Sequence, residues 1–132
     1  MTAPIDSANC LCLSGEPYSQ CCGRFHSGQA QAATAEQLMR SRYSAFALLD
    51  EEYLLRAHHR STAPASLDLD PAMEWRRLDI VGTSNGGPFD TEGTVEFKAY
   101  YRHGNERGVL HENSRFVREN GRWFYVDGDV RA

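Results

Sequence analysis

The fold is decided by residues 95–127, whose sequence is VEFKAYYRHGNERGVLHENSRFVRENGRWFYVD. Apolar and polar residues alternate at the start of this stretch, which is typical of a strand with one buried face. A polar turn at 103–106 and an Asn120-Gly121 dipeptide, a strong hairpin signal, divide it into three strands. An earlier strand at 75–81 precedes a loop at 84–88. The carboxyl half therefore predicts an antiparallel meander.

The hairpin turn sets the register of the last two strands. It pairs Glu119 with Arg122, Phe116 with Tyr125, and Ser114 with Asp127. The turn at 103–106 sets the register of the strand before them. One face of the predicted sheet then carries apolar side chains and two carboxylates, namely Val95, Phe97, Ala99, Tyr101, Leu110, Glu112, Ser114, Phe116, Trp123, Tyr125 and Asp127.

The segment before the sheet is predicted to be helical. Thr34 and Gln37 form a capping box, so a helix is expected from about 35 to 49, followed by a short helix from about 50 to 58. Residues 60–71 are expected to form a loop. One face of the long helix, at spacings of three and four residues, consists of Leu38, Arg42, Phe46 and Leu49. Helices followed by an antiparallel sheet indicate the α+β class.

A carboxylate on an apolar face is costly unless it is paired. Arg42, on the buried side of the helix, is the predicted counter-ion of Glu112 or Asp127, because a guanidinium suits carboxylates. Two interpretations stay open: a structural ion pair, or a pocket for a small molecule. The pocket candidates are Arg42, Tyr43, Phe97, Glu112, Ser114, Trp123, Tyr125 and Asp127.

The strongest chemical signal is a group of four cysteines, Cys10, Cys12, Cys21 and Cys22, spaced C-x-C-x8-C-C. Crowded thiolates of this kind form tetrahedral soft-metal sites, and zinc is the expected ion. Four protein ligands leave no open position, so this zinc is predicted to be structural. Disulfides, redox thiols and free thiols are the alternatives, although a disulfide between the adjacent cysteines is strained.

Histidines offer weaker hypotheses. His26 lies close behind the cysteines and is an alternative ligand. The pair His58-His59 invites a second metal, but neighbours on a helix point about 100° apart. A position at a helix end or on the surface is therefore expected for this pair. His111 is expected to face solvent, with a general base as the alternative if the register differs by one residue.

Composition narrows the classes of partner. The net charge is −4 and the basic residues are dispersed, which argues against nucleic acid as the main partner. No apolar run reaches the length of a membrane span, and the first nine residues lack the features of a secretion signal. A cytoplasmic location, without membrane association, is therefore expected.

The stretch from Cys10 to Gly23 resembles the SEC-C motif, the zinc knuckle at the carboxyl end of the SecA translocation ATPase. The four cysteines match the motif, as do Ser14, Gly15, Tyr18 and Gly23, whereas Leu11 and Leu13 stand where it usually has proline and glycine. In SecA this knuckle contacts a chaperone and the ribosome. The resemblance thus implies a module that contacts a protein partner.

A wider resemblance covers nearly the whole chain. The segments 40–46, RSRYSAF, and 110–116, LHENSRF, resemble the YchJ-like family of bacterial proteins. This resemblance implies a cone-shaped α+β domain similar to nuclear transport factor two (NTF2) and to SnoaL-type enzymes. We therefore expect a knuckle at 1–28 and a cone-shaped domain at 29–132, in which a curved antiparallel sheet packs on the helices.

Three functional hypotheses follow. In the first, the zinc knuckle mediates macromolecular contact and the cone-shaped domain is a scaffold or binds a small ligand. In the second, the inner pocket performs acid–base chemistry on a small organic substrate, which rests on fold analogy alone. In the third, the thiols sense oxidants or metal. A homodimer is compatible with each hypothesis, because many sheets of this kind dimerise.

Overall fold

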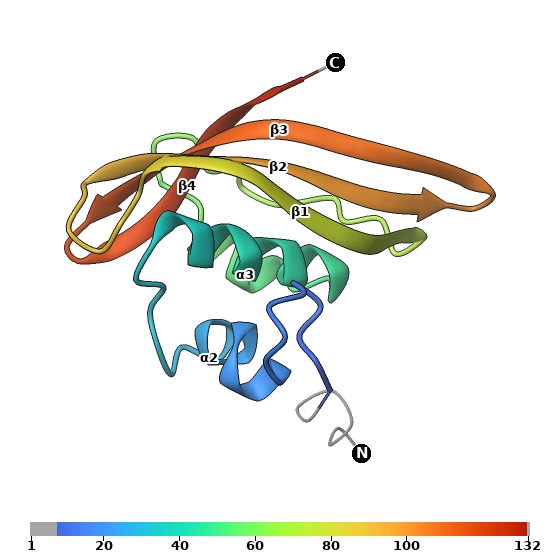
Figure 1. Ribbon diagram of the computed structural model, residues 1–132, viewed down its shortest axis with the longest axis horizontal. Coiled ribbons are helices and arrows are strands. Elements are labelled where there is room, and N and C mark those ends of the chain that lie inside the picture. Colours follow the sequence, from blue (N-terminus) through green and yellow to red (C-terminus); the bar gives the residue numbers. More distant parts are fainter. Residues whose placement is uncertain (1–7, 132) are drawn as a thin grey trace.

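A computed structural model describes residues 8–131. Its elements in chain order are η1 (Tyr18–Gln20), α2 (Cys22–His26), α3 (Ala35–Ala47), α4 (Glu51–Arg56), β1 (Met73–Asn85), β2 (Glu92–His103), β3 (Glu106–Glu119) and β4 (Arg122–Val130). The strands form one antiparallel sheet in the order β1-β2-β3-β4. Figure 1 shows a curved sheet, α3 beneath it, and α2 on the far side of α3. The predicted α+β fold with a curved sheet on helices is confirmed.

Helix α3 begins where the capping residues predict. The Thr34 hydroxyl accepts a hydrogen bond from the Gln37 amide at 3.1 Å, and the Gln37 side chain accepts one from the Ala33 amide at 2.8 Å. The helix ends at Ala47, two residues earlier than expected, because Leu49 has a left-handed backbone with φ of 59°. The chain thus turns sharply into α4.

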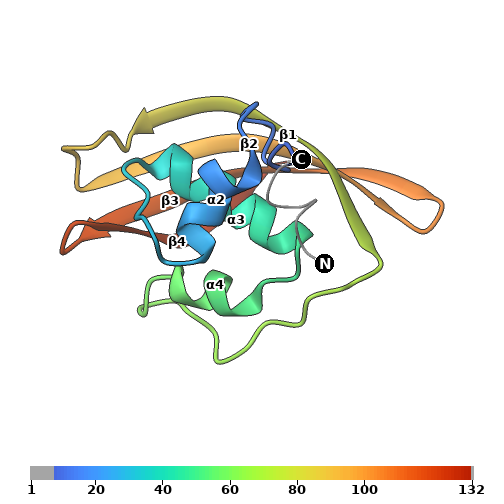
Figure 2. The same cartoon turned by 90° about the horizontal axis from the view of Figure 1, so that it is seen from below.

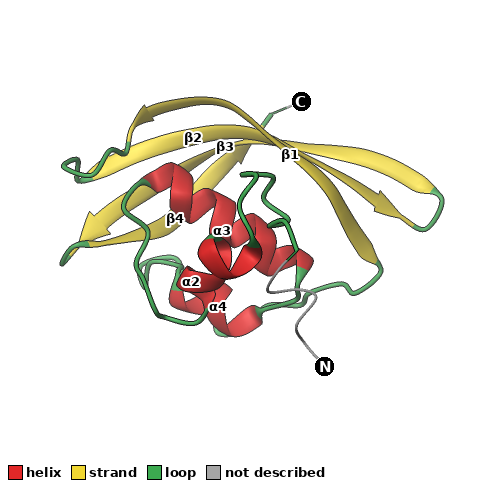
Figure 3. Cartoon of the chain, turned by 60° about the horizontal axis from the view of Figure 1, so that its bottom comes forward, coloured by secondary structure: helices red, strands yellow, loops and turns green. Residues whose placement is uncertain are grey.

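The sheet largely follows the predicted register. Strands β2 and β3 place Glu112 opposite Phe97, and the hairpin between β3 and β4 pairs Phe116 with Tyr125. Register shifts in β1, between 75 and 77 and between 80 and 82, are bulges that bend this strand. Figure 3 shows the resulting sheet curving over the helices.

One part of the register prediction is wrong. Next to the pair of Phe116 and Tyr125, the register of β3 and β4 shifts, because Val126 is an extra residue in β4. Ser114 therefore faces Gly128, and Asp127 faces Arg115. A shift of one residue moves a side chain to the opposite face of a sheet. Asp127 consequently lies on the outer face and not on the inner one.

The core fills the space between the sheet and α3. Its largest fully buried side chains include Phe116, Leu54 and Val95, from three different elements. The segment after α4 joins this core to β4, because the amides of His59 and Tyr125 bond to the carbonyls of Tyr125 and Ala57 at 2.7 and 2.9 Å. Figure 2 shows α4 and the loop after it beside α3.

The described part of the knuckle, residues 8–28, packs on the side of α3 that faces away from the sheet. Arg40 donates to the Cys12 carbonyl at 2.8 Å, and His26 lies 2.8 Å from the Ser41 carbonyl. The predicted domain boundary at residue 28 stays a prediction. Among residues 8–131, no helix has the length and apolar character needed to cross a membrane.

Candidate metal centre and inner cavity

The four cysteine sulfurs converge between the amino-terminal loop and the start of α2. All four Sγ atoms lie within 4.8 Å of one another. The loop that carries Cys10 and Cys12 is closed by a bond from the Cys10 amide to the Glu16 carbonyl at 2.8 Å. Leu13 has a φ of 66°, a conformation that glycine adopts more readily, which explains the glycine usual at this motif position.

The sulfur positions fit a tetrahedral metal ion. Zn–S bonds of about 2.3 Å at tetrahedral angles place sulfurs about 3.8 Å apart. The Cys12 and Cys21 sulfurs are 3.6 Å apart, and those of Cys21 and Cys22 are 4.0 Å apart. A hydrogen bond with the Cys10 sulfur raises the pKa of Cys12 to about 11. Four crowded thiols therefore need a cation before all of them can ionise, as zinc ligation requires.

Hydroxyl groups surround the sulfurs. Ser14 lies 3.1 Å from the Cys21 sulfur, and Ser44 of α3 donates to the Cys22 sulfur at 3.3 Å. Such donors around a thiolate orient the ligand and stabilise its negative charge. Ser44 lies 34 residues after Cys10, so cysteine spacing alone does not reveal it.

The hypothesis that His26 is a metal ligand is wrong in this structure. The metal-capable group contains the four cysteines, and both nitrogens of His26 are used elsewhere. The Nε2 atom bonds to the Ser41 carbonyl at 2.8 Å, so it carries the proton, and Nδ1 accepts from the Tyr18 hydroxyl at 2.6 Å. His26 thus joins the knuckle to α3.

A second feature is a cavity of about 180 Å³ between α3 and the concave face of the sheet. Its lining includes six predicted residues, Arg42, Tyr43, Phe97, Glu112, Ser114 and Tyr125, together with Met39, Phe46, Trp75, Ala99 and Leu110. Phe46, Ala99 and Leu110 were on the predicted inner faces, whereas Met39 and Trp75 were missed. Met39 lies one turn before Tyr43, a signal that helical spacing could have supplied.

Arg42 is only 7% exposed, yet the predicted ion pair with Glu112 or Asp127 is not formed among residues 8–131. Its guanidinium carbon lies 3.9 Å from the centre of the Tyr125 ring, and its Nη1 atom is buried without a hydrogen-bond partner. Desolvation lowers the pKa of Arg42 to about 10. The charge of Glu112 acts on it only at longer range.

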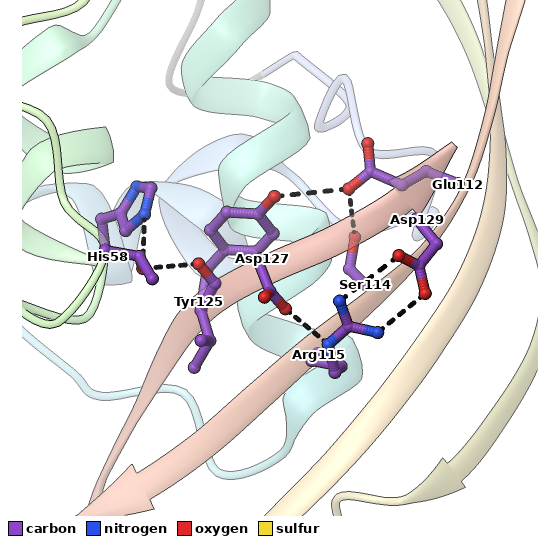
Figure 4. Close-up of polar contacts among 9 residues, drawn as sticks. His58, Glu112, Ser114, Arg115, Tyr125, Asp127 and Asp129 are labelled. Atoms are coloured by element: carbon purple, nitrogen blue, oxygen red, sulfur yellow. Dashed lines mark hydrogen bonds and ion pairs between the residues drawn. The ribbon is translucent and has the colours of Figure 1, made fainter.

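Glu112 is bound by hydroxyl groups. Its Oε2 atom accepts from Ser114 at 2.8 Å and from the Tyr125 hydroxyl at 3.4 Å, as Figure 4 shows. Desolvation, and then the negative charge of Glu112, raises the pKa of Tyr125 to about 12, so this phenol stays a donor. Gly128 leaves room for the carboxylate, because a Cβ atom at that position would overlap Oε2.

Two predicted pocket residues lie outside the cavity. Asp127 binds Arg115 on the outer face, where Arg115 also pairs with Asp129 (Figure 4). Trp123 is on the inner face as predicted, but it is part of the core, and its indole nitrogen donates to the Ala33 carbonyl at 3.1 Å. The bulge in β4 therefore places Asp127 outside the cavity. Trp123 lies on the inner face but away from the cavity.

The remaining histidines bind side chains rather than each other. The His58 ring stands edge-on to Tyr125 at 5.0 Å, and its Nε2 atom lies 3.1 Å from the Thr62 hydroxyl. His59 lies 2.9 Å from Glu119. His111 occupies the outer face as predicted, 2.6 Å from Glu96. No metal site involving these histidines is found among residues 8–131.

Comparison with known proteins gives a consistent result. The family model described as YchJ, middle NTF2-like domain, matches residues 34–128. A UPF0225 protein of Streptomyces coelicolor is 55% identical, over 91% of this chain and 94% of the relative. A UPF0225 protein of Corynebacterium glutamicum is 50% identical, over 92% of this chain and 96% of the relative.

Two solved structures share the fold along nearly the whole chain. The solution structure of a SEC-C motif containing protein from Rhodopseudomonas palustris has a TM-score of 0.82 and 34% identity, covering 95% of this chain and all of that one. The crystal structure of a SEC-C motif containing protein from Psychrobacter arcticus has a TM-score of 0.78 and 27% identity, covering 97% of this chain and 85% of that one. The similarity includes the cysteine-rich segment as well as the sheet.

Proposed function

Since the chain belongs to the YchJ-like family, also designated UPF0225, we propose that it is a zinc-stabilised protein that binds a small organic molecule in its inner cavity. Four thiolates, those of Cys10, Cys12, Cys21 and Cys22, would hold the zinc ion. When bound, zinc crosslinks a segment too small to bury a core of its own. The ligand would bind on the opposite side of α3.

The observation that supports ligand binding is the Nη1 atom of Arg42, a residue that lines the cavity: this nitrogen is buried and has no hydrogen-bond partner among residues 8–131. Buried polar groups in proteins are almost always hydrogen-bonded, and an exception requires an explanation. The cavity of about 180 Å³ is lined mainly by aromatic and aliphatic side chains with a few polar groups, which is typical of ligand sites. A ligand would provide the missing partner.

The size of the cavity limits the ligand. An apolar cavity of about 150 Å³ accepts one benzene-sized molecule. The space here, about 180 Å³, therefore suits one ring or a short branched chain with a small polar group. Under this proposal, a ligand of this size fits the cavity, and the protein does not have to open for a larger substrate.

Filling the cavity with a larger side chain tests the proposed ligand binding directly. Ala99 lines the cavity from β2, and Ala99→Leu would occupy part of the space without adding a polar group. The matched control, Lys98→Leu, puts the same side chain on the outer face of the same strand. Both variants and the wild type would be titrated with a library of ring-sized fragments, with binding followed by amide chemical shifts. We expect fragments to bind the wild type and the control but not Ala99→Leu.

The opposite outcomes would contradict the proposal. Fragments that bind all three proteins equally do not use the cavity. A wild-type protein that binds none of the fragments, although it contains stoichiometric metal and is folded, has no such site. Urea unfolding of each variant would show that a loss of binding does not come from a loss of structure.

A second function is favoured by the surface of the knuckle. Leu11 and Leu13 lie beside the metal ligands and are 43% and 54% exposed. Exposed apolar side chains on a rigid loop suit contact with a protein partner. Pull-down with the wild type and a Leu11→Ser, Leu13→Ser double variant that retains its metal would test this role. A partner that is enriched on both proteins equally would contradict it.

A further inference from the structure

We infer that the ligand of the inner cavity is a small monocarboxylate with an apolar, ring-sized body, whose carboxylate binds the guanidinium of Arg42. This inference rests on the proposed binding function and names the chemical class of the ligand. Such a ligand fits the charge inside the cavity, the groups that are already occupied there and the shape of the walls.

Arg42 brings a positive charge to the lining of the cavity. Its side chain is more than nine-tenths buried, and Nη1 has no hydrogen-bond partner in residues 8–131. The loss of hydration lowers its pKa to about 10, which shows how poorly the surroundings support the positive charge. An anion at Nη1 would restore both a hydrogen bond and a counter-charge. A cationic ligand would add repulsion instead.

In the described part of the chain, no carboxylate bonds to Nη1 of Arg42. Glu112 is the carboxylate that lines the cavity, and its Oε2 atom accepts hydrogen bonds from Ser114 and Tyr125 rather than from Arg42. Asp127, the other candidate counter-ion, is bound to Arg115 on the outer face. Arg42 lines the cavity, and neither carboxylate bonds to its Nη1 atom.

The walls select a planar group at Arg42. The guanidinium carbon of Arg42 lies over the Tyr125 ring, 3.9 Å from its centre, and 5.7 Å from the centre of the Phe46 ring. A guanidinium that is stacked on a ring offers its edge, and a carboxylate matches that edge with two parallel hydrogen bonds. A phosphate dianion would need more donors than one guanidinium and would lie beside the charge of Glu112. We therefore favour a carboxylate.

The rest of the ligand must be apolar and short. Met39, Trp75 and Leu110 form much of the remaining lining. Since about 150 Å³ accommodates a benzene ring, about 180 Å³ leaves room for one ring and little more than a carboxylate. Benzoate is therefore a suitable probe. Benzamide has the same shape without the charge, and benzylamine has a similar size with the opposite charge.

The experiment titrates these three probes into metal-loaded wild-type protein by calorimetry and amide chemical shifts. We expect benzoate to bind at least ten times more tightly than benzamide, and benzylamine not to bind. Arg42→Met removes the charge and keeps an apolar side chain of similar length, and it should weaken benzoate at least tenfold. Arg115→Met removes an arginine on the outer face and should leave the affinity unchanged.

Glu112→Gln should change the affinity for benzoate in the opposite direction to Arg42→Met. The amide keeps an acceptor for Ser114 and Tyr125 but removes a negative charge from the cavity. Benzoate should therefore bind this variant more tightly than the wild type. A structural role of Glu112 alone would not produce this gain.

Two outcomes would overturn the inference. Benzamide or benzylamine binding as tightly as benzoate would show that charge does not select the ligand. Undiminished binding of benzoate to a folded Arg42→Met variant would show that the anion lies elsewhere. If other fragments still bind the wild type but not Ala99→Leu, the cavity remains a binding site and only the carboxylate class is wrong. If no fragment binds, the proposed function itself fails.

Discussion

The two sides of α3 differ in how completely their polar groups are bonded. On the knuckle side, Ser41 donates to the Leu38 carbonyl at 2.7 Å and Ser44 donates to a cysteine sulfur at 3.3 Å. On the sheet side, Arg42 lies between these two serines in sequence, yet its Nη1 atom has no partner in the described chain. Under the proposed function, metal binding would complete the bonding on the knuckle side, and a ligand would complete it on the sheet side.

The largest effect that we expect comes from removal of the metal, which should change the knuckle side of α3 far more than the sheet side. Structural zinc contributes about 10–16 kcal/mol to folding in peptide models. With a chelator, amides in residues 10–26 should lose their protection from hydrogen exchange, while those of β2 and β3 keep most of theirs. Metal analysis before and after treatment is the control. Unchanged protection at 10–26 in metal-free protein would contradict the structural role.

Replacement of Ser44 by alanine tests one hydrogen bond on the knuckle side of α3, the bond from the Ser44 hydroxyl to the Cys22 sulfur. The variant removes the hydroxyl that donates to Cys22, so the metal should bind about tenfold more weakly, which is about 1.4 kcal/mol. Competition with a chromophoric chelator would measure the affinity. Ser84→Ala, an exposed serine of β1, is the matched control. Equal affinities for both variants would mean that the hydroxyl does not support the sulfur.

Replacement of Arg42 by methionine tests, in the ligand-free protein, how this residue on the sheet side of α3 affects stability. The variant loses the stacking on Tyr125 but no longer buries an uncompensated charge. We expect it to be more stable than the wild type by about 1 kcal/mol, or about 3 °C in Tm. Urea unfolding measures this difference. A loss of stability of several kcal/mol would mean that Arg42 has a structural role, which would weaken the contrast between the two sides.

The pH dependence contributed by His58 is the smallest effect. Burial, and then the charge of Arg42, lowers the pKa of His58 in the folded protein. In the unfolded chain the pKa is about 6.5, so the unfolded state binds the proton more readily. This contribution to stability is present above pH 6.5 and is lost as the pH falls below it. Urea unfolding at pH 7.5 and 5.5 should show a smaller loss for His58→Gln than for the wild type, and equal losses would contradict the prediction.

Local signals predicted the elements well. The capping pair at Thr34 and Gln37 located the start of α3, and Asn120-Gly121 located the last hairpin. Both depend on residues that are close together in the sequence, so their geometry follows from backbone chemistry alone. The prediction failed at Val126, where an extra residue moved Asp127 to the outer face. A bulge depends on how two strands fit a curved core, which alternation along one strand does not report.

By itself, the sequence determined the order of helices and strands, the four cysteines of the candidate metal centre and the presence of Arg42 on an inner helix face. These features follow from spacing within short segments, where the period of a helix or strand fixes which side chains share a face. Only the tertiary structure decided that Ser44 donates to a cysteine sulfur, that Glu112 accepts from Ser114 and Tyr125, and that Nη1 of Arg42 has no hydrogen-bond partner within residues 8–131. Contacts of this kind depend on how distant elements pack together, and packing selects among several partners that the sequence pattern allows equally.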